Sequence, residues 1–249
     1  MIENTINNVE NWIKEYVYGA NAKGVVVGMS GGKDSLVTAK LCADALGREN
    51  VLGVLLPNGE MKDAWAAKEA CKVVEIRYHE ANISNAVNSI LEGTKNVLHQ
   101  EWTPVSSVTK TNISPRVRMT MLYAIASSLG YLVVNTSNLS EAMVGYTTKW
   151  GDNVGDFSPL GSFTKTEVCE IGLALGLPEH LVLKTPDDGL SGKSDEENLG
   201  VTYEEIDRFI RTGESKDSEK ILELSKKSSH KRDGVAKFEN GRKNFLDNK

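Results

Sequence analysis

The sequence of 249 residues carries a formal net charge of −5 at pH 7, and 25% of its residues are charged. This acidic balance excludes the basic surface of a dedicated nucleic-acid-binding protein, and the longest apolar runs are far shorter than the roughly 18 residues that cross a bilayer. The three cysteines are scattered, so they indicate neither a zinc ribbon nor a disulfide framework. We therefore expect a cytoplasmic protein with no nucleic-acid or membrane partner, folded as one domain over residues 1–249.

Hydrophobic spacing predicts the first elements in chain order. Apolar residues at spacings of three and four predict a helix over 2–18, and a β-branched run predicts a strand over 25–28. Further strands are expected over three ranges: 51–56, 73–78 and 131–135. Further helices are expected over four ranges, the last of which has Pro115 in its first turn: 35–46, 61–72, 82–98 and 115–128.

Two stretches lack any apolar pattern. The Thr- and Ser-rich stretch 103–113 is expected to be a mobile loop, and the stretch 185–200 is expected to be a second flexible loop. Helices are expected after it over 201–212 and 218–229.

The alternation of strands and helices predicts an α/β fold. The expected architecture is a doubly wound, Rossmann-like parallel sheet with right-handed crossovers and with helices at the C-terminal end of the chain. Ligands of such sheets bind at the carboxyl ends of the strands, near the point where the strand order reverses. Residues 28–35 and 136–141 each follow a predicted strand, so we expect them to line one crevice.

Residues 28–35 read Gly-Met-Ser-Gly-Gly-Lys-Asp-Ser and lie between a predicted strand and a predicted helix. Glycines let backbone N–H groups approach a ligand, and a helix N-terminus favours an anion. The Walker A spacing fails, because Val27 stands where it needs glycine and Asp34 where it needs Ser or Thr. A carboxylate repels phosphate unless a divalent cation bridges the two, so Asp34 predicts a magnesium–polyphosphate site. The alternative is a plain turn from strand to helix.

The segment after the fourth predicted strand offers a second carboxylate. Thr136 and Glu141 are expected near the phosphate loop, and Glu141 is a candidate second magnesium ligand beside Asp34. The alternative is a helix capped by Ser137 or Asn138, with Glu141 in its first turn.

Charged residues further along the chain are candidate ligand contacts. Lys149, Asp152 and Asp156 lie in the glycine-punctuated stretch 145–159, and loop residues of both signs often contact ligand. The run 230–232 (His-Lys-Arg) is either a solvated face or part of a site.

Lys165 follows a predicted helix cap. Thr164 and Glu167 have the capping-box spacing, so Lys165 falls in the first turn of the helix. A cation there opposes the helix dipole, and an anion nearby would offset that cost. Lys165 is therefore a candidate phosphate contact.

These strings resemble a known family. The Ser-Gly-Gly-x-Asp-Ser string at 30–35 resembles the pyrophosphate loop of ATP pyrophosphatases. Six strings in the same order resemble the ammonia-dependent NAD synthetases across nearly the whole chain: 28–35, 112–119, 135–141, 145–159, 163–167 and 230–232. The resemblance implies an adenine nucleotide alpha hydrolase-like fold and a homodimer with the dinucleotide at its interface. It also implies the reaction, in which ATP adenylates the nicotinate carboxylate of deamido-NAD⁺ and ammonia then yields NAD⁺ and AMP.

The resemblance also implies roles for individual residues. Asp34 and Glu141 would bind Mg²⁺, Lys165 would steady the phosphates during adenylation, and Asp152 would orient or deprotonate ammonia. The implied ATP-binding residues are Gly28, Met29, Ser30, Gly31, Gly32, Lys33, Asp34, Ser35, Thr136, Lys165 and Asp187. The implied deamido-NAD⁺-binding residues are Arg116, Lys149, Asp156, His230 and Lys231.

The chain departs from the family pattern at three positions. Leu36 stands where a small residue or second serine is usual, and Lys62 where many members carry arginine for the adenine. Asp187 stands where a hydroxyl residue usually touches ATP, so either Thr185 replaces that contact or it is absent.

Two other functions are left open by these strings. One is another ATP pyrophosphatase with a different acceptor, such as a tRNA thiolase or a GMP-synthetase-like enzyme; the missing Cys-x-x-Cys and the acidic charge disfavour thiolation. The other is a non-catalytic ATP-binding protein, which leaves Asp34, Glu141 and Lys165 unexplained.

Overall fold

The computed structural model describes residues 2–59, 64–184 and 194–237. In these residues four parallel strands form one sheet in the order β3-β2-β1-β4, from β1 (Val25–Gly28), β2 (Val51–Leu55), β3 (Arg77–Glu80) and β4 (Leu132–Val134). The helices are α1 (Ile2–Gly19), α2 (Lys33–Leu46), the 3₁₀ turn η1 (Arg48–Asn50), α3 (Ala64–Val74), α4 (Ser84–Gln100), α5 (Ser107–Leu129), α6 (Leu139–Val144), α7 (Lys165–Ala174), α8 (Glu179–Val182), α9 (Asp195–Leu199), α10 (Tyr203–Thr212) and α11 (Ser218–Arg232).

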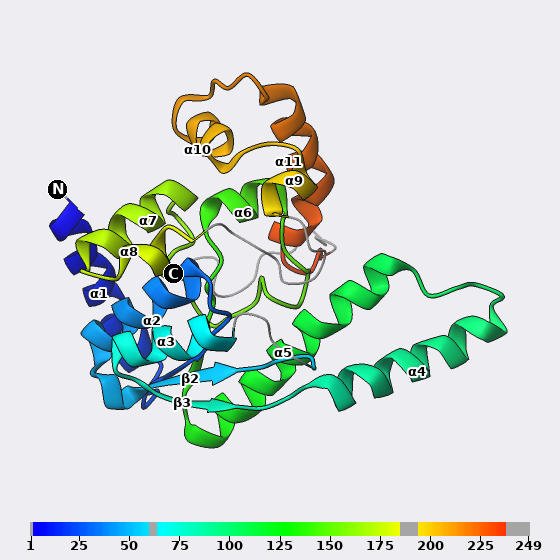
Figure 1. Ribbon diagram of the computed structural model, residues 1–249, viewed down its shortest axis with the longest axis horizontal. Helices are drawn as coiled ribbons and strands as arrows, with labels where there is room; N and C mark the ends of the chain where they lie inside the picture. Colours follow the sequence, from blue (N-terminus) through cyan, green and yellow to red (C-terminus); the bar gives the residue numbers. More distant parts are fainter. Residues whose placement is uncertain (1, 60–63, 185–193, 238–249) are drawn as a thin grey trace, which may run out of the picture.

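Helices cover both faces of the sheet, which confirms the doubly wound α/β prediction (Figure 1). Successive side chains of a strand point to opposite faces. Val25 and Val27 of β1 pack in a cluster with α1, α2, α3, α7 and α8. Val26 packs in a second cluster with Leu52 and with α4 and α5. The inner strands β1 and β2 are apolar on both faces because both faces are buried, whereas β3 at the edge of the sheet is polar and mostly exposed.

The strand order reverses beside β1. The chain runs outward from β1 through β2 to β3 and then returns to place β4 on the other side of β1, where Val26 pairs with Val133. The loops that follow β1 and β4 therefore leave the sheet at neighbouring positions of its carboxyl edge. This is where such folds bind ligands.

One predicted loop and one predicted helix start are wrong. Residues 107–113 form the beginning of α5, which starts after Ser106, whose hydroxyl accepts from the Thr109 N–H. Pro115 consequently lies inside α5 and not in its first turn. The Ser- and Thr-rich sequence has weak helix propensity, but burial of Ile113 and Val117 in the core overrides it.

Two other boundaries were misplaced. The strand predicted over 73–78 begins only at Arg77, because α3 continues to Val74 and buries it in the core. In the loop predicted over 185–200, residues 195–199 form α9, which is capped by Ser194. Residues 185–193 of that loop lie outside the described residues.

Two parts of the molecule extend beyond the sheet and its covering helices (Figure 1). Helices α4 and α5 project together from the sheet, and we call this pair the α4–α5 arm. Helices α9, α10 and α11 pack on α6 around a separate core that contains Val144, Ile206 and Ile221, and we call it the C-terminal helical cluster. None of the helices within the described residues is long and apolar enough to cross a membrane.

Candidate active site

The loop after β1 leads directly into α2 at the carboxyl edge of the sheet. Gly31 adopts a positive φ of 85°, a conformation that favours glycine. The Ser30 hydroxyl accepts from the Gly32 N–H at 3.2 Å, and the Ser35 hydroxyl donates to the Gly32 carbonyl at 2.9 Å. The N-cap of α2 is Gly32, which has no side chain to cap the helix. Its first N–H groups are therefore arranged as in an anion site.

Four loop residues that were predicted to bind ATP are buried, namely Met29, Gly31, Lys33 and Ser35. The Met29 N–H donates to the Val54 carbonyl at 2.9 Å, and the side chain is 2% exposed. Lys33 is also buried, and its Nζ lies 3.6 Å from the sulfur of Cys169 on α7. The side chain of Met29 thus belongs to the core, whereas Lys33 reaches across to α7.

Three charged side chains meet where the loops after β1 and β4 converge. The Lys165 Nζ donates to Asp34 Oδ2 at 2.8 Å and to Glu141 Oε1 at 2.6 Å. Asp34 Oδ1 also accepts from Asn138 Nδ2 at 2.9 Å. The two predicted segments therefore meet: the phosphate loop, α6 and α7 each contribute one member of this group. We call Asp34, Glu141 and Lys165 the charged centre.

The pKa values of Glu141 and Lys165 are both shifted by their buried surroundings. Removal from water raises the pKa of Glu141 to about 7; Lys165 opposes the rise and Asp34 adds to it. Burial alone would lower the pKa of Lys165, but the carboxylates of Glu141 and Asp34 raise it well above its usual value. The centre holds one positive and two negative charges when all three groups are ionised.

Both interpretations of Glu141 have support. The Asn138 side chain accepts from the Glu141 N–H at 3.0 Å, and the Glu141 carboxylate accepts from the Asn138 N–H. The interpretation that Asn138 caps the helix is therefore confirmed. The other carboxylate oxygen of Glu141 faces Lys165. One residue therefore caps α6 and also contributes to the charged centre.

The carboxylates of the charged centre fit a magnesium ion. Mg²⁺ usually takes one or two carboxylates together with phosphates and water. Asp34 and Glu141 supply two such carboxylates beside a phosphate-type loop, and both converge on one cation, the ammonium of Lys165. Among the described residues no cluster of three or more His, Cys, Asp or Glu side chains could hold a metal by itself. Such a set suits an ion shared with a polyphosphate.

A polar cavity of about 240 Å³ adjoins the charged centre. It lies between the segment after β4 and the end of α11, and its lining includes Asn135, Asn138, Asn153 and Lys231. Asn138 lines this cavity and also bonds to Asp34, so one side chain links the cavity wall to the charged centre.

Asp152 is held beside this cavity. Its Oδ1 accepts from the Thr148 N–H at 2.5 Å, and its carbonyl accepts from Asn135 Nδ2 at 2.9 Å. Burial raises the pKa of Asp152. Thr148 in turn donates to Asn112 of α5 at 3.0 Å, which joins two of the strings singled out in the sequence.

Four of the five predicted dinucleotide-binding residues lie together. The Arg116 Nε donates to the Lys149 carbonyl at 3.1 Å, and the Lys149 ammonium donates to the His230 carbonyl. Lys231 donates to the carbonyls of residues 145 and 147, each at 2.7 Å, and burial lowers its pKa. The end of α11 is thus tied to the loop 145–153.

Asp156 is occupied elsewhere. Its Oδ2 accepts from the Val133 N–H of β4 at 2.7 Å, and the Tyr123 hydroxyl donates to Oδ1 at 3.4 Å. This carboxylate therefore closes the edge of the sheet. Thr136 is half-buried between β4 and α6, and Asp187 lies outside the described residues.

Comparison with known proteins identifies the family. A model of the NAD synthase family matches residues 5–242. The chain belongs to the NAD synthase family. An NH(3)-dependent NAD(+) synthetase from Thermococcus sibiricus is 41% identical over 206 residues, which cover 82% of this chain and 78% of the relative. Another from Finegoldia magna is 37% identical over 243 residues, which cover 96% and 97%.

Solved structures agree with this membership of the NAD synthase family. An NMN synthetase from Francisella tularensis matches with a TM-score of 0.87 at 32% identity, covering 96% of this chain and 99% of that one. An NH3-dependent NAD synthetase from Campylobacter jejuni, in complex with the nitrate ion, matches with a TM-score of 0.77 at 26% identity, covering 96% and 100%.

Three residues near the charged centre were not singled out from the sequence. Tyr203 and Asp207 of α10 and Ser140 of α6 all contact Lys165 or its neighbour Thr166. The only available signal was the i, i+4 spacing of Tyr203 and Asp207 on a predicted helix. That spacing does not say which helix they face.

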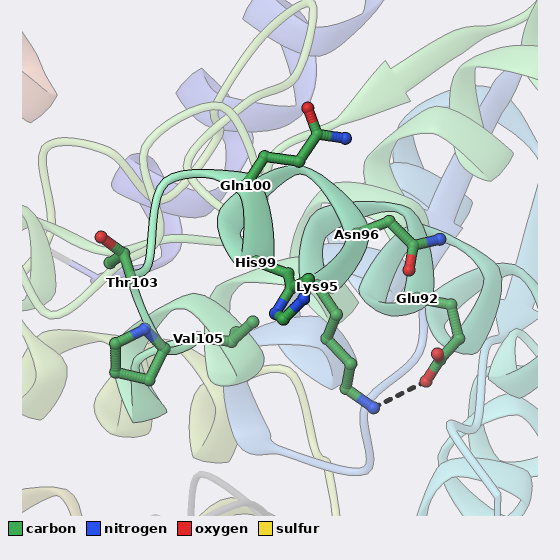
Figure 2. Close-up of a pocket in the computed structure, with 8 residues that line it drawn as sticks. Glu92, Lys95, Asn96, His99, Gln100, Thr103 and Val105 are labelled. Carbon is green, nitrogen blue, oxygen red and sulfur yellow. Dashed lines mark hydrogen bonds and ion pairs between the residues drawn. The ribbon is translucent and has the colours of Figure 1, made fainter.

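A larger cavity, of about 600 Å³, lies on the α4–α5 arm, away from the charged centre (Figure 2). It is lined by Glu92, Lys95, Asn96, His99, Gln100, Thr103, Pro104 and Val105. All of these except Val105 are exposed, and Lys95 pairs with Glu92 at 2.6 Å in Figure 2. An open groove without buried polar groups is a poor candidate for catalysis. The carboxyl edge of the sheet beside β1 is therefore the stronger candidate for the active site of this NAD synthase family member.

Proposed function

We propose that the chain uses ATP and Mg²⁺ to amidate deamido-NAD⁺ with ammonia, through an adenylated dinucleotide, and releases AMP and pyrophosphate. The observation that carries the proposal is the charged centre of Asp34, Glu141 and Lys165. It lies beside the phosphate loop, where the strand order reverses next to β1. Membership of the NAD synthase family supports the same activity.

The first half-reaction needs a leaving group. A carboxylate is a poor electrophile because its oxygen cannot leave; transfer of AMP to that oxygen forms an anhydride and breaks the bond to pyrophosphate. Charge then grows on the phosphates, where the N–H groups of α2 and the ammonium of Lys165 would stabilise it. Asp34 and Glu141 would hold Mg²⁺, which when bound neutralises further phosphate charge.

The second half-reaction needs a nitrogen nucleophile with a free lone pair, which ammonia has and ammonium lacks. Ammonia attacks the acyl carbon of the anhydride, AMP leaves, and one proton is lost from nitrogen. Asp152 would orient the ammonia or accept that proton, because its carbonyl bonds to Asn135, which lines the cavity, and burial raises the pKa of its carboxylate. Arg116, Lys149, His230 and Lys231 would hold the dinucleotide.

One assay tests the proposal. The protein is incubated with ATP, Mg²⁺, ammonium and deamido-NAD⁺, and AMP, pyrophosphate and NAD⁺ are measured together. We expect the three products in equal amounts, with omission of deamido-NAD⁺ as the control. Pyrophosphate release that does not depend on deamido-NAD⁺ would refute the proposal and favour another ATP pyrophosphatase.

A second acceptor is also supported. The match to an NMN synthetase has a TM-score of 0.87, against 0.77 for the Campylobacter NAD synthetase. The acid form of the mononucleotide has the same nicotinate carboxylate and lacks the adenylate half. Comparison of kcat/KM for the two acceptors separates the candidates, and we expect the dinucleotide to be preferred.

We further propose a homodimer with the dinucleotide at the interface. Exposed apolar side chains on the α4–α5 arm support this surface: Ile90 and Val97 lie seven residues apart on one face of α4, and Trp102 is 92% exposed. Sedimentation velocity should give a dimeric mass for the protein and a monomeric mass for Val97→Asp. A wild-type monomer at micromolar concentration would contradict the proposal.

We also propose a cytoplasmic location. The cysteines are unpaired, and Cys42 and Cys71 are buried in the core, as is usual in a reducing compartment.

A further inference from the structure

One face of α10 holds the first turn of α7. Tyr203, Asp207 and Arg211 recur at every fourth position of α10, which places their side chains on one face of the helix. They contact residues 165, 166 and 167 of α7 in that order. We call these three residues the α10 stripe. It joins the C-terminal helical cluster to the residue that completes the charged centre.

Tyr203 contacts the ammonium of Lys165. The Lys165 Nζ lies 4.9 Å from the centre of the Tyr203 ring. A cation within about 6 Å of an aromatic face is attracted to it, and more strongly where water is excluded. Both residues are 5% exposed, and the Tyr203 hydroxyl donates to Asp195 Oδ2 at 3.2 Å, which fixes the ring. The ring therefore adds a third contact to the ammonium.

Asp207 fixes the backbone of the same residue. Its Oδ2 accepts from the Thr166 N–H at 2.8 Å, and its Oδ1 accepts from the Ser140 hydroxyl. The Ser140 oxygen in turn accepts from the Lys165 N–H at 2.9 Å. A carboxylate at a helix N-terminus also offsets the cost of placing a cation there. Asp207 is 7% exposed and Ser140 is fully buried, so these bonds are shielded from water.

Arg211 makes the third and most exposed contact. Its Nε donates to Glu167 Oε1 at 2.7 Å, and its Nη2 donates to the Ser162 carbonyl at 3.0 Å. The side chain is 47% exposed, so this pair contributes less than the two buried contacts.

We propose that Tyr203 and Asp207 are positioning residues that hold Lys165 in place beside the phosphate loop. Tyr203 contacts its ammonium, and Asp207 holds its backbone N–H through Ser140. The inference rests on the proposed function, in which Lys165 contacts the phosphates of ATP. Neither residue belongs to the phosphate loop or to the loop after β4. The geometry of the ATP site therefore depends on the docking of α10.

Four variants test this role. Tyr203→Leu removes the ring, Tyr203→Phe keeps the ring without its hydroxyl, and Asp207→Asn keeps the shape without the charge. Ile206→Val is the matched control, because Ile206 lies on the same helix, is fully buried in the C-terminal helical cluster and is not part of the α10 stripe. For each variant kcat and KM are measured by pyrophosphate release, and Tm by thermal unfolding.

We expect kcat to fall about tenfold or more in Tyr203→Leu and Asp207→Asn, because misplaced charge costs transition-state stabilisation. The KM for deamido-NAD⁺ should stay within about twofold of wild type, since the lost interaction lies at the phosphates. Tyr203→Phe should recover most of the loss, and Ile206→Val should lower Tm without lowering kcat. Unchanged kcat in both Tyr203→Leu and Asp207→Asn, or an equal loss in Ile206→Val, would overturn the inference.

A second measurement is independent of turnover. Lys165 in the ligand-free protein is labelled with an amine-acylating reagent and the rate is followed by mass spectrometry. We expect slow labelling in the wild type and in Ile206→Val, and faster labelling in Tyr203→Leu. Equal rates in all three would overturn the positioning role. If the wild type did not turn over deamido-NAD⁺, the proposed function would fail while this measurement still tested the contact.

Discussion

Replacement of Lys165 by methionine tests how much its ammonium stabilises the charged centre. The methionine keeps the apolar stem but removes the ammonium that bonds to both Asp34 and Glu141. The two carboxylates are each 16% exposed and would lose their common cation. Loss of one partner from a buried ion pair costs about 3–5 kcal/mol when the remaining charge stays uncompensated.

Protonation of Glu141 reduces this cost at low pH. Its pKa is about 7 in the folded protein, and Lys165 is the neighbour that lowers it, so the variant should have a still higher value. The folded state then binds the proton more tightly than the unfolded chain, whose value is 4.5. Stability therefore falls as pH rises from 4.5 toward the folded pKa, by about 1.4 kcal/mol per unit. In the variant this fall should continue above pH 7.

Thermal unfolding between pH 6 and 9 without Mg²⁺ measures the effect. We expect the Tm of Lys165→Met to lie slightly below wild type at the acid end and progressively further below it above about pH 7. Lys40→Met is the matched control, because Lys40 pairs with Asp44 on the surface of α2 and such pairs contribute about 0–1 kcal/mol. A Tm difference that does not change with pH, together with near-normal kcat, would refute this account of the charged centre.

Three further predictions concern single positions. Asp34→Asn removes one of two carboxylates that share a single ammonium, so Tm should not fall while Mg²⁺-dependent turnover is lost; near-normal turnover would contradict the magnesium assignment. Asp152→Asn keeps an acceptor for the Thr148 N–H and removes a buried charge, so Tm should hold or rise while NAD⁺ formation falls by at least about a hundredfold. Undiminished NAD⁺ formation would exclude Asp152 from the ammonia step. Gly145→Ala places a Cβ 2.0 Å from that of Ser228 at a φ of +67°, so Tm should fall by more than about 4 °C, whereas Gly19→Ala, which meets nothing within 4 Å, should not change it.

Features that depend on nearby residues were predicted correctly from the sequence. The strand that ends at Gly28, the glycine-rich turn and the start of a helix lie where expected. The capping box of Thr164 and Glu167 is also present. The turn and the caps are local, because their hydrogen bonds join residues within about four positions of one another, and the strand was predicted from its own β-branched run.

Errors arose where packing overrode local preference. Val73 and Val74 favour a strand by their β-branched side chains, but α3 continues through them and Val74 is buried against the sheet. Residues 107–113 lack apolar periodicity, yet α5 includes them because Ile113 is buried in the core between the sheet and the helices α4 and α5. Propensity is a weak preference that burial readily reverses.

The sequence by itself determined the phosphate loop, the carboxylate within it and the cation in the first turn of α7. Only the tertiary structure decided that the ammonium of Lys165 would bond to the carboxylates of both Asp34 and Glu141. Asp34 and Lys165 are 131 residues apart in the sequence. These contacts form because the chain returns to place β4 beside β1. They also depend on α10, whose Tyr203 and Asp207 contact the first turn of α7. Strand order and helix docking are set by burial of apolar surface over the whole chain, so no local pattern encodes them.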